Sequence, residues 1–155
     1  VGSEMCIRDS CPRNQKPSVS RFIMEPIVQL RAAKIPFIGA IAIHYWYVIL
    51  QANQATRWEI WQKPNLSAHS WGHLHKNLMP VNSGVGNGAS WLETVWTGEF
   101  ARQLAEILEN SPETYPHKYL YRYFPGPNSN TYAQWILNQV KSDYRLSIKG
   151  IGKHF

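Results

Sequence analysis

The segment Ile41–Leu50 constrains the fold more than any other part of the chain. It is apolar on both faces of an extended strand and rich in β-branched and aromatic side chains, among which His44 is the one group that ordinarily titrates near neutral pH. Such a composition is typical of a strand in the middle of a sheet. The whole apolar run, Phe37–Leu50, is 14 residues long, whereas a membrane-spanning helix requires roughly 20. We therefore predict a central strand and no membrane span.

Further strands are predicted on both sides of this segment. Pro26–Ala32 alternates apolar and polar residues, the pattern of a half-buried strand. Gln51–Thr56 is polar enough for a connecting loop, and Arg57–Gln62 resumes the β pattern. Ile41–Leu50 and Arg57–Gln62 are thus expected to form an antiparallel hairpin, and Ala89–Trp96 is expected to add another strand.

Apolar residues recur with helical spacing in two later segments. In the first segment they are Phe100, Leu104, Ile107 and Leu108. Thr97 is the expected cap of this helix, and Asn110–Pro116 is expected to end it. Tyr119–Phe124 then forms a short aromatic strand or an extended segment. A second amphipathic helix begins at Pro125–Thr131, with an apolar face of Tyr132, Trp135, Ile136 and Val140. The pattern predicts an α+β fold, an antiparallel sheet with two amphipathic helices packed on it.

The N-terminal residues are set apart from the predicted domain. Val1–Ser10 resembles translated sequencing adaptor, and Cys11–Ile23 has no hydrophobic period, as expected of a disordered leader. Both cysteines, Cys6 and Cys11, fall in this region. We therefore expect one globular domain over residues 24–155, without a disulfide, a cysteine metal ligand or a cysteine nucleophile.

The formal net charge of +6 is spread over the chain, because lysine and arginine do not cluster. A dispersed charge indicates a solvated basic surface rather than a nucleic-acid interface. The absence of cysteine from the predicted domain leaves the compartment open on redox grounds. We expect a soluble, cytoplasmic protein that binds no nucleic acid and requires no cofactor, with a small molecule or a peptide as its ligand.

The loop Pro125–Thr131 carries the strongest functional signal. Two prolines and a glycine restrict its backbone, and four residues able to cap a helix follow: Asn128, Ser129, Asn130 and Thr131. One cap is enough for a helix. The excess indicates a site where N–H groups and the helix dipole stabilise an anion or oxyanion, with Ser129 as a nucleophile. The alternative is a rigid turn with an elaborate cap.

His44 is the second candidate. A titratable ring inside an apolar strand costs free energy unless it is hydrogen-bonded or used in chemistry. Glu59 lies on the partner strand of the predicted hairpin, where a suitable register would let it orient the ring. Ser129, His44 and Glu59 would then form a catalytic triad. The alternatives are a hydrogen-bonded core histidine and a surface glutamate.

A histidine cluster offers a third possibility. His69, His73 and His75 lie in the irregular segment Lys63–Gly88, and three imidazoles so close together are weak candidates for a zinc site. No metal-binding motif accompanies them, so we predict no metal. The glycines of Ser83–Gly88 match neither nucleotide-binding pattern and indicate a mobile loop.

Several short strings resemble a bacterial family known as domain of unknown function 3750: Val28–Pro36, Ala42–His44, Tyr115–Pro116, Pro125–Tyr132 and Ile151–Lys153. Members of that family carry an acidic residue where His154 stands and continue beyond it, which implies that this chain is truncated at its C-terminus. The order of His44 and Ser129 is also similar to that of circularly permuted papain-like proteins, where a strand histidine precedes a cysteine nucleophile at a helix start. Here serine replaces the cysteine.

Three functions follow from these residues. The first is a hydrolase or acyltransferase that acts on an amide or ester through Ser129 and His44, with N–H groups near Asn128 and Asn130 as the oxyanion site. The second is a non-catalytic module that binds a small ligand or peptide in the same pocket. The third is a metal-dependent hydrolase that uses the histidine cluster.

Overall fold

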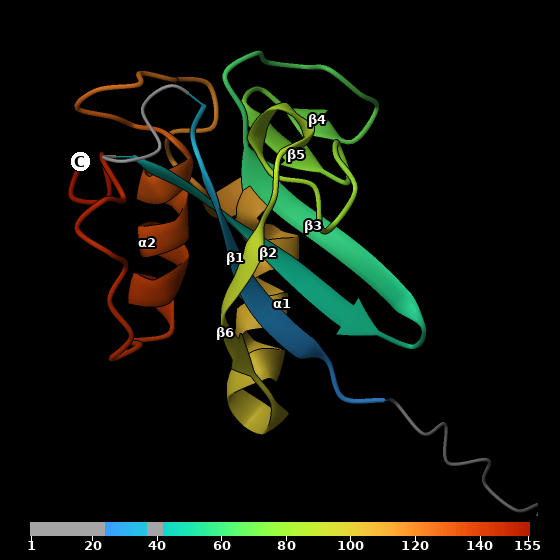
Figure 1. Ribbon diagram of the computed structural model, residues 1–155. Coiled ribbons are helices and arrows are strands. Elements are labelled where there is room, and N and C mark those ends of the chain that lie inside the picture. The colour runs from blue at the N-terminus through green and yellow to red at the C-terminus, as the bar shows by residue number, and fades with distance from the viewer. Residues whose placement is uncertain (1–23, 37–41) are drawn as a thin grey trace, which may run out of the picture.

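The computed structural model describes residues 24–36 and 42–155. It contains one six-stranded antiparallel sheet, in the order β4-β5-β3-β2-β1-β6, and two α-helices on one of its faces (Figure 1). The strands are β1 (Ile27–Lys34), β2 (Ile43–Gln51), β3 (Gln54–Ile60), β4 (Ser70–Trp71), β5 (Leu74–Lys76) and β6 (Trp91–Trp96). The predicted α+β class is confirmed. Val1–Ser10, Cys11–Ile23 and both cysteines lie outside the described residues.

Strand β2 is the centre of the sheet, as its composition predicts. Tyr45 and Tyr47 point to the helices, whereas Trp46 and Val48 point to the other face, and all four are buried. β2 pairs with β1 on one side and with β3 on the other. A strand flanked on both edges and covered on both faces is expected to be mostly apolar, which makes His44 an exception within β2.

The hairpin between β2 and β3 is tighter than the polar loop predicted at Gln51–Thr56. Ala52 and Asn53 alone form the turn, with φ values of 48° and 63°. Two successive residues with positive φ match the right-handed twist of the flanking strands. β3 therefore begins at Gln54, three residues before the predicted start at Arg57, so the predicted loop is wrong although the predicted hairpin is confirmed.

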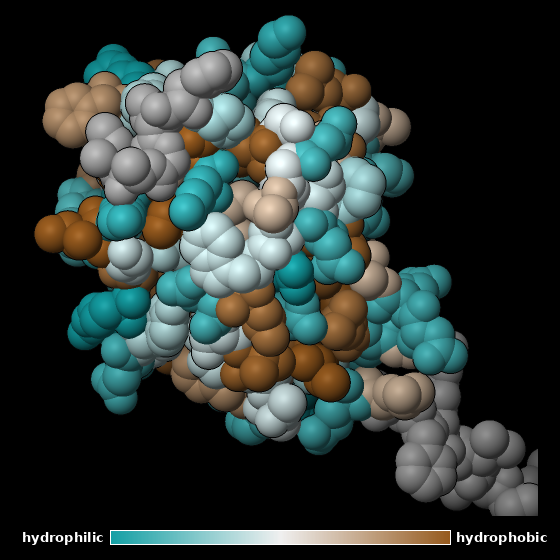
Figure 2. All heavy atoms as spheres, in the orientation of Figure 1, coloured by the Kyte–Doolittle hydropathy of each residue, from teal (hydrophilic) through white to brown (hydrophobic). Residues whose placement is uncertain are grey.

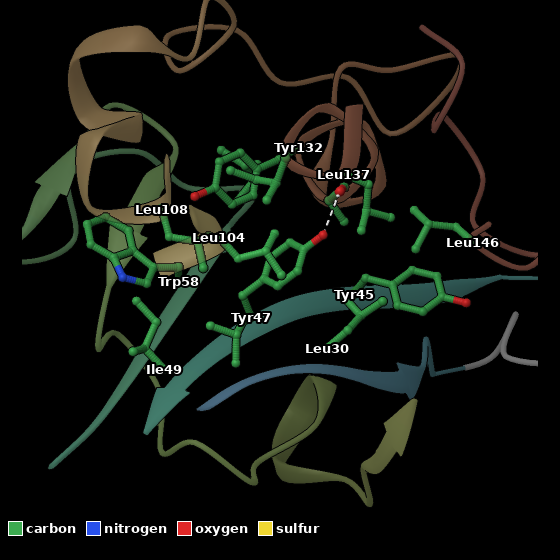
Figure 3. Packing of buried hydrophobic residues seen from close by; sticks show 14 of the residues in the cluster. Leu30, Tyr45, Tyr47, Ile49, Trp58, Leu104, Leu108, Tyr132, Leu137 and Leu146 are labelled. Atoms are coloured by element: carbon green, nitrogen blue, oxygen red, sulfur yellow. Dashed lines mark hydrogen bonds between the residues drawn. The ribbon is translucent and has the colours of Figure 1, made fainter. Parts of the chain in front are cut away.

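The helices α1 (Gly98–Thr114) and α2 (Ser129–Gln139) cover the face of the sheet that carries Tyr45 and Tyr47. Figure 3 shows these side chains pointing from β2 into the core, with the Tyr47 hydroxyl donating to the carbonyl of Ala133 in α2 at 2.8 Å. The tyrosine thus places a polar atom in the core with its partner supplied, as buried polar groups require.

Helix α1 extends beyond its predicted end at Asn110, because it continues through Pro112. A proline inside a helix removes one hydrogen bond to the carbonyl four residues earlier, here that of Leu108. The hydroxyl of Ser111 donates to this carbonyl at 2.7 Å instead. Thr97 is the N-cap residue as predicted, but its side chain makes no capping bond.

The opposite face is covered by part of the segment predicted to be irregular, Lys63–Gly88. Val81 and Val85 pack against Trp46 and Val48 there. The same segment also contains β4, β5 and a short 3-10 helix, η1 (Val85–Asn87), which periodicity did not predict because each is at most three residues long. Tyr119–Phe124 forms no strand.

Some of this face stays open to solvent. In Figure 2 hydrophobic residues gather where β6 lies in Figure 1, and Leu92 and Val95 of β6 are about half exposed. Among residues 24–36 and 42–155, no helix combines the length and the apolar character that a membrane crossing needs.

Candidate active site

The start of α2 is attached to the start of β2. The side-chain amide of Asn130 donates to the carbonyl of Ile43 at 2.8 Å and to that of Ile151 at 2.9 Å. These bonds hold the first turn of α2 against the end of the sheet where His44 emerges, on the face turned away from the helices. The attachment explains how a helix on one face presents Ser129 to a histidine on the other.

Ser129, His44 and Glu59 form one hydrogen-bonded chain. The Ser129 Oγ lies 2.8 Å from His44 Nδ1, and His44 Nε2 lies 3.2 Å from Glu59 Oε2. All three residues are almost completely buried, with 7%, 5% and 0% of their surface exposed. The structure therefore brings together the three residues that the sequence predicted as a triad.

Glu59 is ionised in this arrangement. Burial by itself would raise its pKa, but the hydrogen bond from His44 and the positive charge of Arg57 together outweigh burial and lower it. The Arg57 guanidinium donates to Glu59 Oε2 at 2.6 Å. An ionised Glu59 accepts a hydrogen bond from the N–H at His44 Nε2, which leaves Nδ1 as the acceptor for the Ser129 hydroxyl.

Arg57 was missed in the sequence. It is fully buried, stacks on Trp46 with 4.2 Å from its guanidinium carbon to the ring centre, and donates to the carbonyls of Pro80 and Ser83 at 2.7 and 2.6 Å. The signal was present in the alternation of Arg57 and Glu59, which puts both side chains on one face of β3. Buried arginine requires such partners, because an unpaired buried charge costs several kcal/mol.

Aromatic rings restrict the histidine further. His44 stacks on Trp46 with ring centres 5.5 Å apart, and Trp61 approaches it edge-on at 5.6 Å. A ring held between two indoles and by hydrogen bonds at both nitrogens has little freedom to rotate. The site is thus preorganised, as a general base requires.

The loop residues predicted as the oxyanion site serve chiefly as a cap. Asn128 Oδ1 accepts from the backbone N–H of Asn130 at 2.9 Å and of Thr131 at 3.4 Å, and Thr131 Oγ1 accepts from the N–H of Asn128 at 3.0 Å. This is a complete capping box. The N–H groups of Asn128 and Asn130 are therefore occupied. The N–H of Ser129 itself has no acceptor among the described residues.

Ser129 opens onto a pocket of about 150 Å³. His44, Asn128, Asn130 and Gln62 supply its other polar groups. The remaining lining is apolar or aromatic and comprises Ile35, Ile60, Trp61, Val85, Tyr121, Tyr123 and Ile151. A preformed, mostly apolar pocket with a few convergent polar groups is the usual form of a small-molecule site.

The three other predicted histidines do not converge. His75 is buried, with its nitrogens bonded to Ser70 Oγ at 2.7 Å and to the carbonyl of Lys63 at 3.0 Å. His73 bonds to the carbonyl of Trp61, whereas His69 is exposed. Among the residues that the structure describes, no three histidine, cysteine or acidic side chains are arranged to hold a metal ion. The histidine cluster therefore gives no support to the metal-dependent alternative.

Acid is expected to remove the stabilisation that ionised Glu59 provides. Its pKa is lowered from the ordinary 4.5 by folding, so the unfolded chain takes up the proton first as the pH falls. This stabilisation is complete above the ordinary pKa and declines as the pH falls through the folded-state value. Urea unfolding between about pH 7 and pH 3 measures the decline. The Glu59→Gln variant should lose this pH-dependent stabilisation. The Glu109→Gln variant, which changes a half-exposed pair with Lys76, should retain it. Equal acid dependence in wild type and Glu59→Gln would contradict the assignment.

The fold and the site together define a class of protein. It is an α+β protein in which serine, histidine and glutamate are hydrogen-bonded in series at a pocket. The chain belongs to the family described as Protein of unknown function (DUF3750), whose sequence model matches residues 25–155. This confirms the resemblance predicted from the short strings, and the family description assigns no activity. No curated protein and no solved structure matches the chain.

Proposed function

We propose that this protein is a hydrolase or acyltransferase that cleaves an ester or amide, with Ser129 as nucleophile and His44 as general base. The observation that carries the proposal is the continuous hydrogen-bonded chain from Ser129 Oγ through His44 to Glu59, with Ser129 and His44 lining a pocket. Hydrogen-bond reach between nucleophile and base, with the base oriented by a third group, is the common arrangement of activated nucleophiles.

The reaction follows from the proton positions. Ser129 Oγ attacks the carbonyl carbon of the substrate, and its proton passes to His44 Nδ1. The bond from that carbon to the leaving oxygen or nitrogen breaks, and the leaving group takes the proton from Nδ1. Water, or a second alcohol or amine, then releases the acyl group from Ser129 by the reverse sequence. The negative charge of Glu59 stabilises the imidazolium between the two proton transfers.

The N–H of Ser129 is the proposed oxyanion donor, in place of those of Asn128 and Asn130. It lies in the first turn of α2, where the dipole favours negative charge. Asn128 and Asn130 act indirectly, because the first caps the helix and the second fastens it to β2. Both asparagines, and Thr131, are therefore positioning residues.

The structural alternatives leave two features unexplained. Asn128 provides the cap, so Ser129 is not needed for it. A core histidine needs neither a serine nor a buried glutamate that must be compensated by a buried arginine. The His44 ring is oriented differently from the histidine of the chymotrypsin triad, because Nδ1 rather than Nε2 faces the nucleophile. The permuted papain-like arrangement remains a prediction.

A fluorophosphonate probe tests the nucleophile. We expect the wild-type chain to be labelled once, at Ser129, and Ser129→Ala to be unlabelled, because among the serines that the structure describes this is the one with a base within hydrogen-bond reach at the pocket. Mass spectrometry of the intact chain and of its peptides measures the label. Ser142→Ala, which removes a hydroxyl bonded to the Tyr144 N–H, should label like wild type.

Equal labelling of wild type and Ser129→Ala would overturn the enzymatic proposal. The second function, a binding module without catalysis, would then be favoured, because the pocket persists without the hydroxyl. Circular dichroism of each variant establishes that a loss of labelling is not a loss of folding.

A further inference from the structure

We infer that the pocket holds the neutral, apolar acyl group of an ester, of about six carbon atoms by comparison with cavities of known occupancy. The inference rests on the proposed function, because it names the substrate class of the same site. It also chooses between the ester and the peptide that the sequence left open.

The charge of the lining carries the first step. Among the described residues that line the pocket there is no lysine, arginine, aspartate or glutamate. Glu59 and Arg57 lie close by, but each is fully buried and they pair with one another rather than face the pocket. A charged substituent on the acyl group would lose its water without gaining a counter-ion, which is unfavourable. The acyl group is therefore uncharged.

The chemistry of the walls carries the second step. Most of the pocket wall is hydrocarbon surface. It is contributed by Ile60 and Trp61 at the end of β3, by Val85 of the segment Lys63–Gly88, and by Tyr121. The polar lining is confined to the Ser129 end and to Gln62. A peptide would bring several backbone N–H and C=O groups into this space, most of them without partners. An ester with a hydrocarbon acyl chain has no N–H to satisfy.

The size of the pocket carries the third step. Its volume of about 150 Å³ equals that of an engineered apolar cavity that binds benzene, a six-carbon molecule. Longer acyl groups would extend past the mouth, where Tyr123 is 42% exposed, and would gain less from each further methylene.

The walls of the pocket are held rigidly, so the limit on the length of the acyl chain should be sharp. The Asn128 side-chain amide donates to the Tyr123 carbonyl at 2.9 Å, and Asn130 holds the Ile151 carbonyl. Gly152 lies so close to Asn128 that a Cβ at this position would overlap it. The side chains that place Ser129 thus also hold two walls of the pocket, which links acyl-group selection to the nucleophile.

Turnover of p-nitrophenyl esters tests the inference. From acetate to hexanoate, each added methylene should raise kcat/KM about fourfold, the gain from burying one methylene. Decanoate should gain little beyond hexanoate. The half-ester of succinate should react at least about tenfold more slowly than butyrate, which has the same number of acyl carbons. Equal rates across the neutral series, or a faster succinate half-ester, would overturn the inference and leave the nucleophile assignment intact.

A pocket variant supplies the matched control. Ile151→Trp fills the pocket without removing the backbone carbonyl that Asn130 holds, so it should lower kcat/KM for hexanoate at least about tenfold more than kcat/KM for acetate. Ile148→Trp makes the same substitution at a side chain that is 89% exposed and should behave as wild type. Equal effects of the two variants on hexanoate would overturn the inference.

Binding separates this inference from the proposed function. Ser129→Ala cannot form an acyl-enzyme, yet it should bind hexanamide, observed by saturation-transfer NMR, and should not bind the monoamide of adipic acid, whose chain ends in a carboxylate. Hexanamide binding without ester turnover by the wild type would support the pocket assignment and contradict the nucleophile. Failure of folded Ser129→Ala to bind hexanamide would overturn the inference.

Discussion

His44→Gln is expected to slow fluorophosphonate labelling of Ser129 by about 10³-fold, within the range attributed to a positioned general base. Glutamine is close to histidine in size and can still hydrogen-bond to Ser129 and Glu59, but it cannot accept a proton at neutral pH. The loss would therefore report base catalysis rather than a collapsed site. Rates of labelling per folded molecule, measured at several probe concentrations, check the prediction.

His75→Gln is the matched control for this prediction. His75 is also buried in the sheet and bonded at both ring nitrogens, but its partners are Ser70 and a backbone carbonyl, and it does not line the pocket. We expect a comparable loss of stability and a labelling rate within a few-fold of wild type. An equal loss of rate in both variants would show that the effect of His44→Gln is structural.

Arg57→Met is expected to lower the free energy of unfolding by about 3–5 kcal/mol, the range for breaking one side of a buried ion pair. It leaves the carboxylate of Glu59 without its shortest hydrogen bond and the carbonyls of Pro80 and Ser83 without their donor. Since domains are stabilised by only about 5–15 kcal/mol, the effect is large. Urea unfolding followed by tryptophan fluorescence measures it.

The double variant Arg57→Met/Glu59→Leu separates stability from activity. Replacing both partners of a buried pair by apolar residues is often neutral, so we expect part of the lost stability to return. The labelling rate should stay low, because Glu59 no longer holds the proton on His44 Nε2. Recovery of the rate together with the stability would contradict a positioning role for Glu59 and Arg57.

Two features of the site were accessible in the sequence for different reasons. His44 is conspicuous because a strand buried on both faces tolerates few polar residues, and the partners of such a residue have to come from elsewhere in the fold. Ser129 is conspicuous because it stands among four residues able to cap a helix, where one cap is enough. Neither argument indicates that the two residues meet.

The burial of Arg57 and, within the part of the chain that the structure describes, the free N–H of Ser129 became apparent only in the tertiary structure. The charge of Arg57 suggests a surface residue, and its burial follows only from the segment that folds over Trp46 and supplies two carbonyl acceptors. The N–H of Ser129 was overlooked because the competition among Asn128, Asn130 and Thr131 for the cap depends on backbone geometry that composition does not specify.

By itself, the sequence determined the central strand, the hairpin, the two amphipathic helices and the identity of the two chemically exceptional residues, because hydrophobic periodicity and capping are local properties of the chain. Tertiary structure alone decided the register that sets Glu59 beside His44, the extension of α1 through Pro112 and the attachment of α2 to β2 through Asn130. These features depend on contacts between residues that are up to 87 positions apart, and a local pattern carries no information about which distant partner satisfies a buried polar group.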